Sequence, residues 1–126
     1  MTFLTGHKPM VVGRGIRTGI RIATDQPASV GADLVADAAA GAQEHEGPLL
    51  IFDLGTATTC SVVDGNRTYL GHIIMPGIRI SQDALTERTS QLPHVRFEKP
   101  RHEIIYDPDL LLKGLWYIYN KKESES

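Results

Sequence analysis

The chain has a single cysteine, few aromatic residues and no long apolar segment. Cys60 is its only cysteine among 126 residues, and aromatic residues make up 6%. A lone cysteine excludes an internal disulfide, which favours a reducing compartment. No apolar run approaches the roughly 20 residues of a membrane-spanning helix, and the start of the chain lacks the pattern of a signal peptide. We therefore expect a cytoplasmic protein that does not bind membranes.

Charge and histidine content exclude two further classes of function. The formal net charge is -2, which gives no general attraction for nucleic acids. None of the 5 histidines pairs with another histidine or with Cys60 at the spacing of a metal site. The apolar fraction of 41% and the charged fraction of 22% are typical of a soluble globular protein with one ordinary domain.

The longest helical pattern runs over residues 25–47. Apolar residues recur there at helical spacing, with Pro27 near the start and Gly47 at the end. Asp33 and Asp37 are four residues apart and therefore share one face of this helix. That face is either solvated or, at Asp33, directed into a site. Further helices are expected at 80–92 and 110–119.

Short apolar runs separated by turn residues predict a meander of strands. The runs are found at 48–53, 60–64 and 67–75, and a shorter strand is expected at 9–12. Together with the helices, these strands indicate an α/β fold. The charged residues 120–126 predict a disordered tail.

The segment GRGIRTGIR (13–21) leaves two interpretations open. Its glycine spacing does not match the dinucleotide fingerprint, and no helical pattern follows it directly. It is either a solvated loop, which is the usual place for arginines, or a loop that faces an anion with Arg14, Arg17 and Arg21.

The stretch IFDLGTATT (51–59) has the composition of a phosphate-binding turn between two strands. Glycine lets the backbone approach a ligand closely. Threonine hydroxyls and successive backbone N–H groups donate to phosphate oxygens, and an aspartate can hold a cation. Taken alone, the stretch fits an ordinary polar hairpin turn equally well.

Four motifs in order resemble the type III pantothenate kinase family. They are VGADLVADAAA (30–40), LLIFDLGTATTCSVVDG (49–65), YLGHIIMPGIRIS (69–81) and ALTERTSQLPHV (84–95). The resemblance spans residues 9–100 and implies an incomplete actin-like (ribonuclease-H-like) kinase fold, with a mixed sheet flanked by helices. It divides the chain into the end of a first domain (1–47), the start of a second (48–119) and the tail (120–126).

The same resemblance implies an activity, namely ATP-dependent phosphorylation of pantothenate in the first step of coenzyme A biosynthesis. It further implies a homodimer that uses ATP, a divalent metal such as magnesium, and potassium or ammonium as a monovalent cation. Asp33 matches the proton acceptor, and Asp53 matches the residue that binds the monovalent cation. Gly55 and Thr56 match the ATP-binding turn. The motif that contacts pantothenate is occupied by Gly31, Ala32, Asp33 and Leu34.

The sequence departs from the family pattern in several places. Leu34 replaces the arginine of Gly-x-Asp-Arg, and His72 replaces a glycine. No Asp-x-Gly-Asn-Thr loop precedes residue 9, and no threonine occurs at 106–112. We therefore expect part of a longer enzyme, whose strand at 49–53 exposes an edge or an apolar face and so promotes dimerisation or poor solubility. The alternatives are a non-catalytic protein that keeps the scaffold and a different actin-like nucleotide binder.

Overall fold

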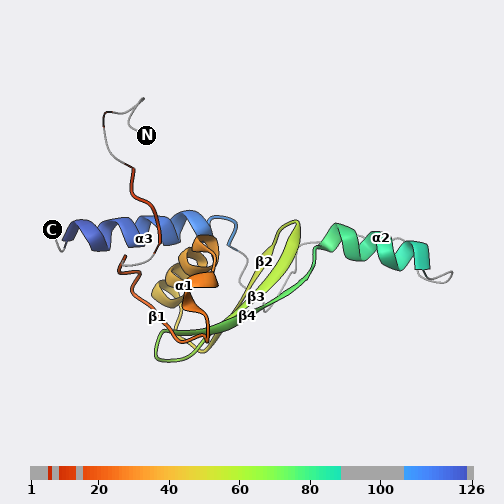
Figure 1. Cartoon of the computed structure of the whole chain (residues 1–126), viewed down its shortest axis with the longest axis horizontal. Coiled ribbons are helices and arrows are strands. Elements are labelled where there is room, and N and C mark those ends of the chain that lie inside the picture. The colour runs from red at the N-terminus through yellow and green to blue at the C-terminus, as the bar shows by residue number, and fades with distance from the viewer. Residues whose placement is uncertain (1–5, 7–8, 14–15, 89–106, 125–126) are drawn as a thin grey trace.

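The computed structural model describes residue 6 and residues 9–13, 16–88 and 107–124. Figure 1 shows a curved sheet with two helices stacked on one side and a third helix beyond its end. The elements in chain order are β1 (Arg21–Ile22), the 3-10 turn η1 (Pro27–Ser29), α1 (Ala32–Glu44), β2 (Leu49–Leu54), β3 (Ala57–Val63), β4 (Thr68–Pro76), α2 (Ile78–Arg88) and α3 (Leu110–Ser124).

The sheet is mixed, with the strand order β1-β4-β3-β2. Strands β2, β3 and β4 form the expected antiparallel meander, and β1 pairs parallel to β4. The turn from β3 to β4 is fixed by Asp64, whose Oδ1 accepts hydrogen bonds from the backbone N–H groups of Asn66 (2.9 Å) and Thr68 (2.8 Å). The α/β class and the meander predicted from the sequence are thus confirmed.

Helix α1 is buried on both sides, which explains its unusual number of alanines. Its residues 34–42 are all buried. On one side, Ala38 and Ala42 pack against Val63 and Tyr69 of the sheet. Small side chains allow the helix to approach the strands closely. A polar side chain on α1 can therefore be buried as well, as Asp37 is.

The other side of α1 packs against α3. Ala36 and Ala39 form a buried cluster with Ile118, and Gly114 brings the backbone of α3 against Ala36. Figure 1 shows α1 lying between α3 and the sheet. The described part of the chain therefore has three layers: sheet, α1 and α3.

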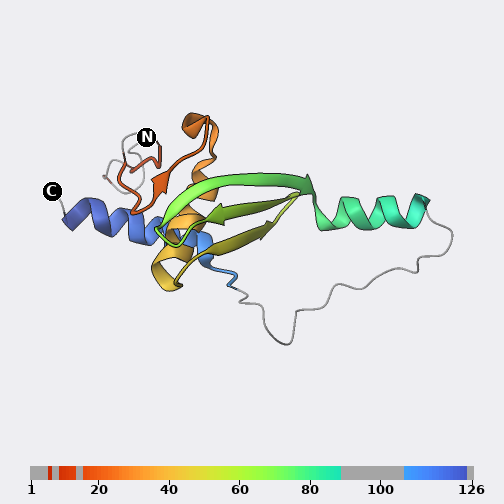
Figure 2. The same cartoon turned by 90° about the horizontal axis from the view of Figure 1, so that it is seen from below.

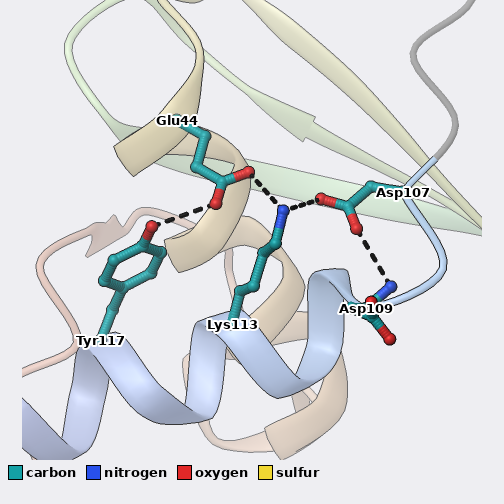
Figure 3. A network of polar contacts seen from close by, with 5 residues as sticks. All are labelled: Glu44, Asp107, Asp109, Lys113 and Tyr117. Carbon is teal, nitrogen blue, oxygen red and sulfur yellow. Dashed lines mark hydrogen bonds and ion pairs between the residues drawn. The ribbon is translucent and has the colours of Figure 1, made fainter.

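A polar network fixes the start of α3 to the end of α1 (Figure 3). Lys113 Nζ lies 2.7 Å from Asp107 Oδ2 and 3.2 Å from Glu44 Oε2. The Tyr117 hydroxyl donates a 3.0 Å hydrogen bond to Glu44 Oε1. The hydrogen bond from Lys113 lowers the pKa of Asp107 below its usual value. Lys113 itself is exposed to solvent, so the two ion pairs orient α3 more than they stabilise the fold.

One face and one edge of the sheet carry exposed apolar side chains. On β2, which is the edge strand, Leu50 is 65% exposed and Phe52 is 54% exposed, and Ile73 of β4 is 60% exposed. Helix α2 buries none of its residues and extends away from the end of the sheet (Figure 2). The expected exposed edge is therefore present, whereas dimerisation and poor solubility stay predictions.

The helices differ in extent from the sequence prediction. Helix α1 begins at Ala32 because Gly31 has an extended backbone (φ -60°, ψ 146°), and the segment around Pro27 forms the separate turn η1. Helix α3 continues to Ser124, so residues 120–124 are helical and the prediction of disorder there was wrong. Helix α2 ends at Arg88, and the rest of the predicted span, 89–92, lies outside the described residues.

The strands differ at one place. Residues 9–12 form no strand, and the parallel partner of β4 is Arg21–Ile22, which begins at the last residue of the expected loop 13–21. Elements on both sides of residue 47 pack together, since β1 and α1 contact the strands that follow. The division into two domains stays a prediction. None of the described helices is long and apolar enough to cross a membrane.

Gly114→Ala should destabilise the protein, although alanine favours an isolated helix by about 1 kcal/mol over glycine. A methyl group at Gly114 would overlap the carbonyl oxygen of Ala36, so α3 would have to move away from α1. We expect the free energy of unfolding to fall by roughly 1–3 kcal/mol in urea titrations. Gly13→Ala is the matched control, because an added methyl there meets nothing within 4 Å. A variant Gly114→Ala that is more stable than the wild type would contradict this packing.

Candidate functional site

The candidate site lies where the first half of α1 passes over the end of β2. Gly41 of α1 contacts this strand, since a Cβ built on it would lie 2.8 Å from Ile51 Cδ1. Asp37 is one helical turn before Gly41, and Asp53 is two residues after Ile51. Because alternate residues of a strand share a face, Asp53 lies on the face of the sheet that α1 covers. The geometry therefore brings Asp37 towards Asp53.

The hairpin between β2 and β3 carries the glycine and threonine residues singled out in the sequence. Asp53 is the direct cross-strand partner of Thr59, and Gly55 N–H donates a 3.1 Å hydrogen bond to the Ala57 carbonyl across the tip. Gly55 and Thr56 are exposed at this tip, which extends beyond α1 in both views (Figures 1 and 2). A side chain at Gly77 would overlap the Thr56 carbonyl oxygen. The glycine directly after β4 is thus needed for close packing on the turn.

The first turn of α1 presents a carboxylate at the helix N-terminus. Gly31 is the N-cap residue and Asp33 is the acidic residue of the first turn, with an exposed side chain. The partial positive charge of a helix N-terminus favours an ionised carboxylate there. Leu34, in contrast, is only 7% exposed, so its side chain belongs to the packed interior.

Asp37 is buried, although the sequence allowed it a solvated helix face. Its side chain is 6% exposed. Burial, followed by repulsion from Asp53 and then Asp33, raises the pKa of Asp37 to about 6. Three carboxylates therefore share one region: Asp33 at the helix start, Asp37 one turn later and Asp53 on the strand.

A second polar group continues along the same face of the sheet. The Tyr69 hydroxyl lies 3.0 Å from His72 Nδ1 and 3.3 Å from Ser61 Oγ. Ser61 is two residues after Thr59 and directly opposite His72. His72, which takes the place of a glycine in the family pattern, is therefore accommodated as a hydrogen-bonding partner of Tyr69.

A hollow of about 950 Å³ lies on the N-terminal side of α1 and is mostly apolar. Ala32, Arg17 and Lys121 are among its lining residues. Arg21 is directed elsewhere and donates a 3.3 Å hydrogen bond to Thr68 Oγ1. Arg14 lies outside the described residues. The anion-facing interpretation of this loop therefore rests on Arg17 and stays a prediction.

Comparison with known proteins gives a consistent result. Residues 2–109 match the family model of type III pantothenate kinase. This chain belongs to the type III pantothenate kinase family. It is 50% identical over 93 residues to the type III pantothenate kinase of Agathobacter rectalis. The aligned residues make up 74% of this chain and 36% of the relative.

Two further type III pantothenate kinases show similar overlap. The protein of Exiguobacterium sibiricum is 41% identical over 98 residues, 78% of this chain and 39% of its own length. The protein of an Exiguobacterium species is 46% identical over 93 residues, which are 74% of this chain and 37% of that protein. The chain thus spans less than two-fifths of the length of these relatives.

The structure brings together only some of the residues that the type III pantothenate kinase motifs single out. Asp33 and Asp53 both act on the charge of Asp37, whereas Gly55 and Thr56 lie farther out at the hairpin tip. Sequence reasoning did not include Asp37 and Thr59 in the site. The four-residue spacing from Asp33 and the cross-strand position opposite Asp53 were the available signals.

The buried carboxyl group of Asp37 should make the protein less stable as pH rises. Its pKa of about 6 exceeds the ordinary 3.8, so the folded state holds this proton more tightly than the unfolded state. The stabilisation is complete below about pH 4 and is lost by about pH 6, with a difference of about 3 kcal/mol. Asp37→Asn should remove this component, giving a smaller decrease in unfolding free energy between about pH 4.5 and 7.5. Identical pH profiles of wild type and variant in urea titrations would contradict the burial of this charge.

Proposed function

We propose that this chain forms the substrate-binding and cation-binding part of an enzyme that transfers a phosphoryl group from ATP to the hydroxyl of pantothenate. Membership of the type III pantothenate kinase family supports the reaction class. The observation that carries the proposal is the position of Asp33, an exposed carboxylate in the first turn of α1, one helical turn from Asp37. The product, 4'-phosphopantothenate, would enter coenzyme A biosynthesis.

Asp33 would act as the proton acceptor for the pantothenate hydroxyl. A carboxylate within hydrogen-bond reach of a hydroxyl can take its proton as the phosphoryl group is transferred. Gly31 leaves room for the Asp33 carboxylate, because a Cβ at Gly31 would overlap Asp33 Oδ1, and the neighbouring Ala32 is exposed. Leu34 would contribute by packing, because its buried side chain has no charge to offer a substrate.

The hairpin after β2 would hold the ATP phosphates and a monovalent cation. Gly55 and Thr56 offer an exposed turn in which backbone N–H groups and a hydroxyl can donate to phosphate oxygens. Asp53, just before this turn, supplies a carboxylate oxygen for potassium or ammonium. A magnesium ion bound with ATP would neutralise phosphate charge when present. These residues fit the proposed groups by their donor chemistry.

The assembly that we propose is a homodimer in the cytoplasm. The exposed apolar side chains of β2 support a further contact, because large unpaired edge strands are normally covered. A non-catalytic scaffold remains the second candidate. It is favoured by Leu34 in place of arginine and by the absence of threonine at 106–112.

The direct test is ATP-dependent phosphorylation of pantothenate by the purified chain with potassium and magnesium. We expect turnover in the wild type and a loss of at least about 100-fold in Asp33→Asn, because a positioned general base contributes at least that factor. Asp83→Asn is the matched control, since Asp83 is exposed on α2, and it should keep wild-type turnover. No turnover by the folded wild-type chain would favour the non-catalytic scaffold.

A further inference from the structure

The side of α3 that faces away from α1 carries large apolar residues, which we call the α3 stripe. They recur at spacings of three and four residues and therefore lie on one face of the helix. The members of the stripe are Leu112, Leu115, Trp116 and Tyr119. All four are exposed, Leu112 by 66% and Trp116 by 60%. Single exposed apolar residues are normal, whereas a contiguous stripe of them indicates an interaction surface.

The α3 stripe is distinct from the face of α3 that packs on α1. Gly114 and Ile118 are buried on that inner face, and Lys113 and Tyr117 donate hydrogen bonds to Glu44 at the end of α1. Figure 1 shows α3 as the outer layer on this side of the described structure, with α1 and the sheet beneath it. The inner face therefore fixes the position of α3, and the stripe is not needed for this packing.

The two ends of the stripe carry opposite charges. Asp109, whose carbonyl accepts a 2.9 Å hydrogen bond from Lys113 N–H, lies one turn before Leu112. Lys122 lies one turn after Tyr119, in the last turn of the helix.

The order of these positions is symmetric about the middle of the stripe. Residues 109, 112 and 115 lie as far before the point between 115 and 116 as residues 122, 119 and 116 lie after it. A second copy of α3 that runs in the opposite direction would therefore bring each acidic end to a basic end and each apolar residue to another. Contacts with two-fold symmetry, in which the same surface of both copies meets, are the commonest in homo-oligomers.

We propose that the α3 stripe is the dimer interface of this protein and binds the α3 stripe of a second copy in antiparallel orientation. Asp109 pairs with Lys122 of the second copy. Leu115 packs against Trp116 of the second copy, at the centre of the interface. The inference rests on the proposed function only in taking the assembly to be a homodimer, and it places the contact between the copies on α3.

The fluorescence of Trp116 reports on this contact without any assay of activity, because it is the only tryptophan of the chain. Its emission should shift to shorter wavelength as the protein concentration rises, and sedimentation velocity should give the dissociation constant. Trp116→Ala should raise that constant at least about tenfold, because buried aromatic residues dominate the energetics of interfaces. Phe52→Ala is the matched control, since it removes an exposed aromatic side chain from β2, and it should leave the constant unchanged.

Charge reversal tests the antiparallel orientation. Asp109→Lys and Lys122→Glu should each raise the dissociation constant roughly three- to tenfold, because like charges then meet at both ends of the interface. The double variant with both substitutions should return close to the wild-type value, since the opposite charges are present again with their places exchanged. Far-UV circular dichroism of each variant checks that α3 is retained. A double variant that dimerises no better than either single variant would overturn the proposed orientation.

The outcomes that would overturn the interface are distinguishable. A wild-type chain that is monomeric at every concentration would remove the homodimer and leave the proposed phosphoryl transfer untouched. A dimer that is lost in Phe52→Ala and kept in Trp116→Ala would keep the homodimer and move its contact to β2. An emission shift of the monomeric chain on addition of phosphatidylcholine and phosphatidylglycerol vesicles, with no shift on self-association, would assign the α3 stripe to a lipid surface.

Discussion

The burial of α1 between the sheet and α3 is the constraint on which the rest of the described structure depends. A helix enclosed on two sides can be covered closely only if its residues are small, and alanine and glycine supply most of its buried positions. Ala38 and Ala42 pack against the sheet, and Gly114 lets the backbone of α3 contact α1 at Ala36. The same packing encloses Asp37, which would otherwise be an ordinary acidic residue on a helix surface.

The candidate site follows from this packing. Because Gly41 sits over Ile51, the helical turn before it sits over the end of β2, where Asp53 and Thr59 face each other across the hairpin. The exposed Asp33 at the helix start and the buried Asp37 differ mainly in solvation. Desolvation, followed by repulsion from Asp53 and Asp33, raises the pKa of the buried Asp37. Two acidic residues on one face of α1 thus differ in their exposure to solvent.

The sequence predicted the parts of the fold that local patterns encode. Alternating apolar runs and turn residues located the meander, and Gly55 and Thr56 fell at a hairpin tip as expected. The short strand Arg21–Ile22 was missed, because its pairing with β4 depends on contacts far away in the sequence. Helix α3 extends to Ser124 through residues whose charge alone suggested disorder. The burial of Asp37 was not predictable from spacing, since it depends on the packing of α1 against strands that follow it in the sequence.

Leu50 and Phe52 of β2 and Ile73 of β4 are exposed on the face of the sheet that α1 does not cover. Relatives in the type III pantothenate kinase family are more than twice as long as the stretch that matches. The carboxylate cluster, in contrast, is built entirely from described elements. It can therefore be studied in this chain directly.

The central claim is that α1 holds Asp37 in a buried position beside Asp53, and NMR titration of the Asp37 side-chain carboxyl group tests it most directly. The account predicts a pKa of about 6 in the wild type and a lower value in Asp53→Asn, because the second largest cause of the shift is then removed. A wild-type pKa near the ordinary 3.8, unchanged by Asp53→Asn, would contradict it.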